Sequence, residues 1–240
     1  MKIGIIGFGR FGQLMVEYIA GDCPVFVSSR SATPEQVAES GAELVNLEQV
    51  CQCDVVIPSV PITTFETMIQ RIAPLLSDNL VLDVCSVKEY PVEVMLKHLP
   101  ESVQILATHP MFGPDSAAET IQGQKIVLSN IRVGTKLYNK IKQYCMDKGL
   151  VVVETTPENH DRQIARSQVL THFIGRGLSE YGAKDVEIDT EGYKRLLKTL
   201  EVVRNDTDQL FADLNRYNKY AAEMRDSFIK ALQDIDGKLS

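Results

Sequence analysis

Two short polar clusters in this sequence have the composition of a site for proton transfer. The first comprises residues 83–88 (Asp-Val-Cys-Ser-Val-Lys), and the second comprises residues 108–116 (Thr-His-Pro-Met-Phe-Gly-Pro-Asp-Ser). Each cluster follows an apolar run that is typical of a strand buried on both faces. Because parallel strands carry their carboxyl ends to one edge of a sheet, we expect Ser86 and His109 to share a crevice there.

The side chains of these clusters suit general acid–base chemistry. His109 titrates near neutral pH, so its ring can accept a hydroxyl proton while a hydride leaves the same carbon. Ser86 can orient the histidine or the substrate hydroxyl by a hydrogen bond. Lys88 can hold a substrate carboxylate or face the solvent, and the sequence favours neither. A structural role for His109 is the alternative, but its place at a strand end favours catalysis.

The start of the chain predicts the element that would hold a dinucleotide beside these clusters. An apolar run at residues 3–6 leads into Gly7, Gly9 and Gly12, which have the G-x-G-x-x-G spacing. In a strand–turn–helix unit these glycines allow a tight turn, close approach of a pyrophosphate and close helix packing. An ordinary glycine-rich turn is the alternative. The residues expected to contact the cofactor here are Gly7, Phe8, Gly9, Arg10, Phe11 and Gly12.

The end of the second expected strand, residues 24–28, predicts which dinucleotide binds. An acid there would hold the ribose hydroxyl of NAD, but the chain has Ser29, Arg30 and Ser31. A guanidinium flanked by hydroxyls suits a 2′-phosphate, so we expect NADP, with NAD possible. Arg30 could instead stack on the adenine or face solvent. Further expected cofactor contacts follow the strand at residues 54–59, and they are Ser59, Val60 and Pro61.

The alternation of apolar runs and helix patterns predicts the fold. Residues 1–155 read as a doubly wound, Rossmann-type α/β domain with a mostly parallel sheet. From Thr156 onward the pattern is helical, which predicts a small all-helical domain over residues 156–240. Its last expected helix opens with a capping box at residues 206–209 and carries a near-heptad apolar stripe. The stripe predicts a dimer interface, with packing back on the α/β domain as the alternative; it comprises Leu210, Leu214, Tyr217, Ala221, Met224, Phe228, Leu232 and Ile235.

A second polar group lies on the expected helix at residues 157–181. Gln168, His172 and Arg176 are spaced by four, so they form a polar row on an otherwise apolar helix. Such a row predicts a substrate cleft or a subunit interface, and a hydrogen-bonded row inside the helical bundle is an equal alternative. We expect the other two histidines, His98 and His160, at the surface.

Composition narrows the function classes. The chain has 240 residues, a hydrophobic content of 44% and a formal net charge of −7, with both signs interspersed. We therefore expect a folded protein that takes a small molecule and does not bind nucleic acid. No apolar run reaches membrane-spanning length, so we expect a cytoplasmic protein without a membrane contact. Five cysteines in no zinc or redox pattern predict reduced thiols and no metal site.

Four motifs together resemble one family. They are Gly7-Phe-Gly-Arg-Phe-Gly12, Asp83-Val-Cys-Ser-Val-Lys88, Thr108-His-Pro-Met-Phe-Gly-Pro114 and Ser167-Gln-Val-Leu-Thr-His172. They look like the prephenate/arogenate dehydrogenases of tyrosine biosynthesis, nearest the arogenate dehydrogenases of plants and cyanobacteria. The resemblance covers the α/β part and thins after Gly192-Tyr193. It implies that NAD(P)⁺ takes hydride from the ring carbon bearing the hydroxyl while the ring carboxylate leaves as CO₂.

The resemblance also implies roles for individual residues. His109 matches the catalytic histidine, Ser86 the serine that aligns it, and His172 a histidine on the substrate side. The family holds a substrate carboxylate with a basic residue on a C-terminal helix and dimerises through such helices. Lysine in place of the family's arginine puts this clamp in doubt, and the candidates are Lys198, Arg195 and Arg204.

Two alternatives in function stay open from the sequence. One is another small NADP-dependent oxidoreductase, of the β-hydroxyacid dehydrogenase or imine reductase type. The other is a non-catalytic NADP-sensing module. Prephenate and arogenate differ by a keto group against an ammonium, so an acidic partner would favour arogenate. Asp115 and Glu119 are the candidates for that partner.

Overall fold

The computed structural model describes residues 1–239, without the side chain of Val202. The chain forms two compact units, one over Met1–Pro157 and one from Glu158 onward. The change of unit falls at the start of the expected helix at residues 157–181. Each unit is described here by itself.

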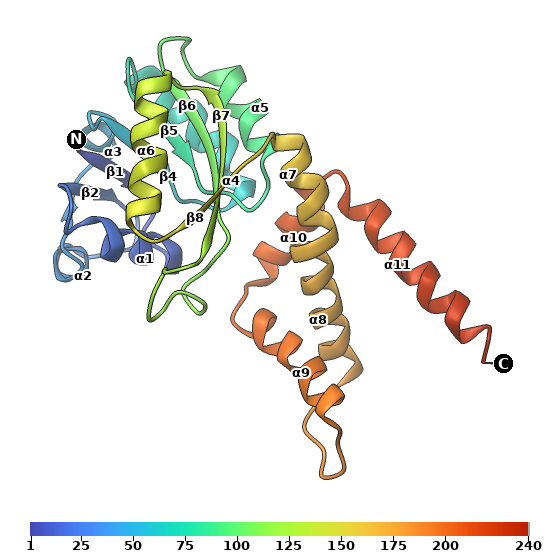
Figure 1. Ribbon diagram of the computed structural model, residues 1–240. Helices are drawn as coiled ribbons and strands as arrows, with labels where there is room; N and C mark the ends of the chain where they lie inside the picture. The colour runs from blue at the N-terminus through green and yellow to red at the C-terminus, as the bar shows by residue number, and fades with distance from the viewer. Residues whose placement is uncertain (240) are drawn as a thin grey trace. The chain divides into compact units, whose positions relative to one another are not determined.

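The first unit is built on an eight-stranded sheet in the order β3-β2-β1-β4-β5-β6-β7-β8 (Figure 1). Neighbouring strands run parallel, apart from β6 and β7, which are antiparallel. The predicted doubly wound, mostly parallel sheet is therefore confirmed. The strands are β1 (Ile3–Ile6), β2 (Val25–Ser28), β3 (Glu43–Leu44), β4 (Val55–Pro58), β5 (Leu80–Asp83), β6 (Gln104–Pro110), β7 (Lys125–Arg132) and β8 (Val151–Glu154).

Helices cover both faces of this sheet, because its strands are apolar on both sides. The helices of the first unit are α1 (Arg10–Ile19), α2 (Pro34–Glu39), α3 (Leu47–Val50), α4 (Ile62–Ile72), α5 (Glu89–His98) and α6 (Thr135–Asp147). Val16 of α1, Val37 of α2 and Tyr138 of α6 join one core cluster with Ile5 of β1. The other face of β1 meets α3 at Gly4, where an added Cβ would lie 2.7 Å from a Val50 methyl.

The second unit consists of helices in the described residues. They are α7 (Pro157–Ile164), a π-helical turn η2 (Ala165–Val169), α8 (Leu170–Tyr181), α9 (Glu191–Arg204), α10 (Asp208–Tyr217) and α11 (Ala221–Asp236). Figure 1 shows α8 and α9 side by side. Gly175 permits this packing, because a Cβ there would lie 2.8 Å from a Val203 methyl.

The prediction of one long final helix is wrong, because the chain breaks between α10 and α11. Asn218 is buried at the break, and its side chain donates to the Asp161 carbonyl (2.8 Å) and accepts from the Tyr220 N–H (3.0 Å). These bonds replace the helical ladder locally. The predicted capping box is also wrong, since Thr207 caps α10 by accepting from the Leu210 N–H (3.1 Å).

Candidate active site

The turn after β1 has the geometry that close approach of a phosphate needs. Gly7 has φ +107°, and a Cβ there would lie 2.2 Å from the Ser59 carbonyl oxygen. A Cβ on Gly12 would lie 2.5 Å from the Gly7 carbonyl oxygen, so these two glycines are required by packing. A Cβ on Gly9, in contrast, would meet nothing within 4 Å. The space at Gly9 is therefore open to a ligand.

The N-terminus of α1 adjoins this open space. Gly9 is its N-cap, and no side chain in residues 1–239 caps this end. Backbone N–H groups at a helix start, with the positive end of the helix dipole, suit a pyrophosphate. Phe8 and Phe11 pack their rings against the core, so only their backbone lies in the turn. These residues fit a bound dinucleotide.

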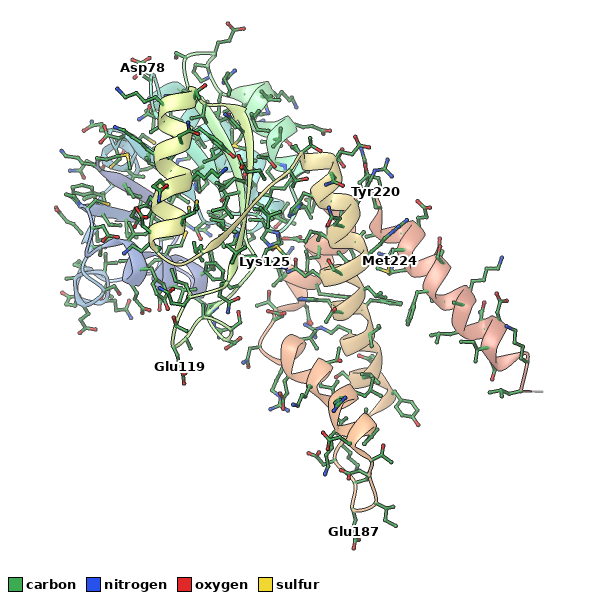
Figure 2. The ribbon with its side chains drawn as sticks, viewed as in Figure 1. Asp78, Glu119, Lys125, Glu187, Tyr220 and Met224 are labelled. Carbon is green, nitrogen blue, oxygen red and sulfur yellow. The ribbon has the colours of Figure 1, made fainter. Side chains whose placement is uncertain are left out.

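Arg10 forms an ion pair across the same edge of the sheet. Its guanidinium lies 2.6 Å from the Asp115 carboxylate, and both side chains are exposed. Asp115 belongs to the loop between β6 and β7, and Glu119 lies exposed in the same loop (Figure 2). One of the two acids considered for a substrate ammonium is thus already paired with an arginine.

The end of β2 presents the residues expected at the adenosine ribose. The Ser29 hydroxyl accepts hydrogen bonds from the N–H groups of Ser31 (3.3 Å) and Ala32 (3.2 Å), which orders the loop. Arg30 is exposed between them. A fixed loop with a solvent-facing guanidinium fits a 2′-phosphate. After β4, the Ser59 N–H donates to the Ile6 carbonyl (2.8 Å), which places residues 59–61 beside the glycine turn.

The two polar clusters lie at the carboxyl ends of neighbouring parallel strands. β5 and β6 pair in parallel, with Asp83 opposite Ala107. Ser86 follows β5 by three residues and is half-buried. His109 lies near the end of β6, and only 3% of it is exposed. The structure therefore places Ser86 and His109 at one edge of the sheet, as the sequence predicts.

Both expectations for Lys88 are wrong, because its side chain neither faces solvent nor has an open side for a substrate. Lys88 and Asp83 are both 0% exposed and form an ion pair. The Lys88 ammonium also donates to the Thr108 carbonyl (2.5 Å). Burial raises the pKa of Asp83, while Lys88 and backbone N–H groups oppose that rise. A buried cation needs such partners. The residue type alone does not predict that Lys88 has them.

The predicted polar row of the second unit is buried and incompletely bonded. His172 is 4% exposed, and Gln168 and Arg176 are partly buried. Each contributes a buried atom without a hydrogen-bond partner in the described residues: Gln168 Oε1, His172 Nδ1 and Arg176 Nε. Unsatisfied buried polar atoms are costly, so three of them in one row are unusual in a folded protein. The adjoining π-helical turn, which the sequence did not reveal, is a frequent feature of functional sites.

The segment between α9 and α10 and the first residue of α10 supply acids to this row. Asp206 Oδ2 lies 3.5 Å from His172 Nδ1, and Arg176 pairs with Asp208 (2.9 Å). Burial lowers the pKa of His172, and Asp206 opposes this shift. Sequence reasoning assigned Asp206 to a capping box and so missed its place beside His172. In the sequence, Asp206 is only an acid next to the Thr207 cap. Acids are common at helix starts, so its type and position did not point to His172.

The three basic candidates of α9 do not converge. Arg195, Lys198 and Arg204 are all exposed, and Arg195 lies 3.9 Å from the Glu191 carboxylate. Arg195 and Arg204 are about two and a half helical turns apart, which puts them on opposite sides of α9. The structure of this unit therefore does not assemble them into one carboxylate clamp.

The other two histidines differ in their surroundings. His98 is partly exposed and lies 2.9 Å from the Glu66 carboxylate, near the surface as expected. His160 is buried, with 3% exposed, and its Nδ1 lies 2.7 Å from the Asp161 carboxylate. The prediction of a surface His160 is wrong, because α7 packs against the Asn218 break, where the Asn218 side chain donates to the carbonyl of the neighbouring Asp161.

Residues 1–239 contain no cluster of side chains that could hold a metal ion, and their five cysteines are free thiols. None of the helices in this part of the chain combines the length and the apolar character of a membrane span.

Comparisons with known proteins identify the family. Residues 26–154, more than half of the chain, match the family model described as prephenate dehydrogenase, nucleotide-binding domain. Residues 177–240 match one described as TYRAAT1-like, C-terminal domain. The chain is 32% identical to arogenate dehydrogenase 2 of Arabidopsis thaliana over 250 aligned residues, covering 100% of this chain and 70% of that protein. It is also 32% identical to arogenate dehydrogenase 1, of which it covers 39%.

A solved structure shares the fold over the whole length. The prephenate dehydrogenase of A. aeolicus, in complex with hydroxyphenyl propionate and NAD⁺, superposes with a TM-score of 0.78 at 20% identity. The alignment covers 100% of this chain and 90% of that one. On the family match and the Arabidopsis relative, this chain belongs to the prephenate/arogenate dehydrogenase family of NAD(P)-dependent oxidoreductases.

Proposed function

We propose that the protein catalyses NADP-dependent oxidative decarboxylation of a cyclohexadienyl substrate, arogenate in the first place, within tyrosine biosynthesis. The observation that carries this proposal is the placement of Ser86 and His109 at adjoining strand ends, at the edge where the glycine turn opens. In such sheets, ligands bind beyond the carboxyl ends of the strands.

Each residue has a defined task in this reaction. The bound nicotinamide supplies the acceptor for the hydride that leaves the hydroxyl-bearing ring carbon. His109 accepts the hydroxyl proton, and Ser86 orients the histidine or that hydroxyl. Burial of His109 excludes water from the proton transfer. Loss of the ring carboxylate as CO₂ then makes the ring aromatic, which draws the reaction forward.

The preference for NADP rests on the loop after β2. Arg30 and the hydroxyls of Ser29 and Ser31 match the charge and hydrogen-bonding capacity of a 2′-phosphate. An NAD site would instead need an acid for the ribose hydroxyl, and residues 28–31 contain none. NADP is therefore the cofactor that this loop favours.

The preference for arogenate rests on the family resemblance and on Asp206. The resemblance gives His172 a place on the substrate side, and the Asp206 carboxylate lies 3.5 Å from His172 Nδ1 within the second unit. Arogenate carries an ammonium where prephenate has a keto group, so a carboxylate that meets the substrate stabilises arogenate more. Two Arabidopsis relatives are named arogenate dehydrogenases, which agrees with this choice.

A homodimer through α11 completes the proposal. The apolar side chains of its second half are exposed: Ile229 (41%), Leu232 (53%) and Ile235 (56%). A row of large exposed apolar residues on one helix is typical of an interface between subunits.

One assay tests the reaction and both preferences. Reduced cofactor is followed by absorbance while arogenate and prephenate are each combined with NADP⁺ and NAD⁺. We expect the highest kcat/KM for arogenate with NADP⁺, together with CO₂ release. Hydride transfer to another substrate without CO₂ would favour a different oxidoreductase. Cofactor binding without turnover of either substrate would favour a sensing module.

A further inference from the structure

The strand ends that carry Ser86 and His109 share one fully buried polar network. The Asp83 carboxylate accepts hydrogen bonds from the Cys85 N–H (3.1 Å) and the Thr108 N–H (3.2 Å), besides its ion pair with Lys88. The Thr108 hydroxyl donates to the Asp83 carbonyl (2.6 Å), and Lys88 donates to the Thr108 carbonyl (2.5 Å). Donors and acceptors from both strand ends are thus bonded to one another.

Both proposed catalytic residues lie next to atoms of this network. Ser86 directly follows Cys85 and precedes Lys88 by two residues, so its loop is held at both ends. His109 directly follows Thr108, whose N–H, hydroxyl and carbonyl are all bonded. A shift of the network would therefore move Ser86 and His109 relative to each other.

Stability alone does not account for an ion pair in this place. Burial of both charges removes their hydration, and an apolar pair of similar volume often stabilises a core as well or better. What an apolar pair lacks is directional bonds that tie three backbone groups to two side chains. Reactions of oriented groups are sensitive to displacements of about 1 Å, so fixed geometry has a direct effect on turnover.

We propose that Lys88 and Asp83 are positioning residues that hold Ser86 and His109 at a fixed separation. Neither needs to touch the substrate or the cofactor. This inference rests on the proposed catalytic roles of Ser86 and His109, and it assigns to Lys88 a task other than binding a substrate carboxylate.

The test compares single variants with a charge-neutral double variant. Lys88→Met or Asp83→Asn alone leaves one buried charge unpaired, so each should lower the thermal midpoint. The double variant Asp83→Asn/Lys88→Met removes both charges and should recover most of that stability. We expect its kcat to stay at least ~tenfold below wild type, with unchanged NADP affinity, because the bond to Thr108 is missing. A double variant with recovered stability and wild-type kcat would overturn the proposal.

A matched control comes from the other end of α5. Lys97 and Glu66 form an exposed ion pair (3.0 Å), and Glu66→Gln/Lys97→Met should leave kcat unchanged. An NMR titration of the histidine rings gives a readout that needs no activity, with His109→Asn identifying the His109 signal. The double variant should shift the His109 midpoint by ~0.5 pH unit or more. An unmoved midpoint contradicts positioning even if wild type turns over neither substrate, an outcome that by itself rejects only the proposed function.

Discussion

At the scale of single residues, His109 is the side chain on which the proposed chemistry depends most. Its backbone is fixed in the sheet, where β6 pairs with β5 on one side and with β7 on the other. The ring is almost entirely buried, so its position is determined by packing and not by solvent. A side chain held in this way is already oriented to act as a base, so it does not have to rearrange before the proton transfer.

Replacement of His109 should separate binding from chemistry. His109→Asn keeps a polar group of similar size but removes the base, so we expect kcat to fall on the order of a hundredfold or more. The Kd for NADP, measured by fluorescence, should not change. His98→Asn is the control, since His98 pairs with Glu66 near the surface. Equal losses of kcat in both variants would speak against His109 as the base.

Replacement of Arg30 should change the choice of cofactor. Arg30→Ala removes a charged donor to the 2′-phosphate, which is worth about 1.5–3 kcal/mol, or roughly a 10- to 100-fold rise in KM for NADP⁺. KM for NAD⁺ should stay constant or fall. Arg71→Ala, on an exposed arginine in the last turn of α4, should alter neither constant. Steady-state kinetics with one substrate and each cofactor in turn measure the two KM values. An equal rise in KM for NAD⁺ and NADP⁺ would contradict a contact between Arg30 and the 2′-phosphate.

Residue types alone did not predict how Lys88 and His160 are used. Lys88 lies in a polar cluster after an expected strand and His160 in the expected helix at residues 157–181, and residues of these types are mostly exposed or only partly buried. Each is buried through a specific partner: Asp83 for Lys88 and Asp161 for His160. Partnership of this kind depends on three-dimensional packing, which composition and spacing do not contain.

At the scale of elements, local signals predicted most of the first unit correctly. Thr33 and Gln36 form a reciprocal capping box at the start of α2, and their spacing in the sequence is typical of one. Phe65, Ile69 and Ile72 form the buried face of α4 at helical spacing. These features depend on neighbours within four residues, so the sequence contains all the information they need. The placement of Ser86 and His109 followed from strand order alone.

Local sequence patterns do not predict the break between α10 and α11. The apolar stripe continues through it with helical spacing, so periodicity favours one helix. What ends α10 is the bond from Asn218 to the carbonyl of Asp161, 57 residues away. The contact of Asp206 with His172 is likewise made across a loop and two helices. Long-range contacts of this kind decided both of these features.

The polar row on α8 predicts a pH dependence of stability. Burial lowers the pKa of His172, so the unfolded chain binds a proton at pH values where the folded chain does not. The stabilisation is complete above the ordinary value of 6.5 and is lost as pH falls toward the lower folded pKa. The slope is at most about 1.4 kcal/mol per pH unit for one group. Urea unfolding between pH 8 and 5 measures it.

His172→Asn should flatten that dependence, whereas His98→Asn should keep the wild-type curve. Each variant removes one histidine that lies near one carboxylate, Asp206 for His172 and Glu66 for His98, so the comparison separates the buried histidine from the one nearer the surface. Identical curves for wild type and His172→Asn would show that the histidine is not held neutral by burial.

At the scale of the whole molecule, α11 is the element least explained by one chain. Its first residue, Ala221, is fully buried, yet its residues from Ile229 to Asp236 are all exposed. Figure 2 shows Tyr220 and Met224 at the start of this helix. Large apolar side chains in water gain about 1.5–3 kcal/mol each on full burial, so several of them in one row favour association.

The dimer proposal predicts that charges on this row produce monomers. Leu232→Glu/Ile235→Glu places two carboxylates in the interface, where burial without a partner opposes association. We expect sedimentation analysis to give a dimer for wild type and a monomer for this variant, with the first unit still folded and binding NADP. Lys230→Glu/Asp234→Lys, on exposed polar positions of the same helix, is the charge-changing control and should remain a dimer. A wild-type monomer at micromolar concentration would contradict the proposal, because the exposed row would then be stable in water without a second subunit.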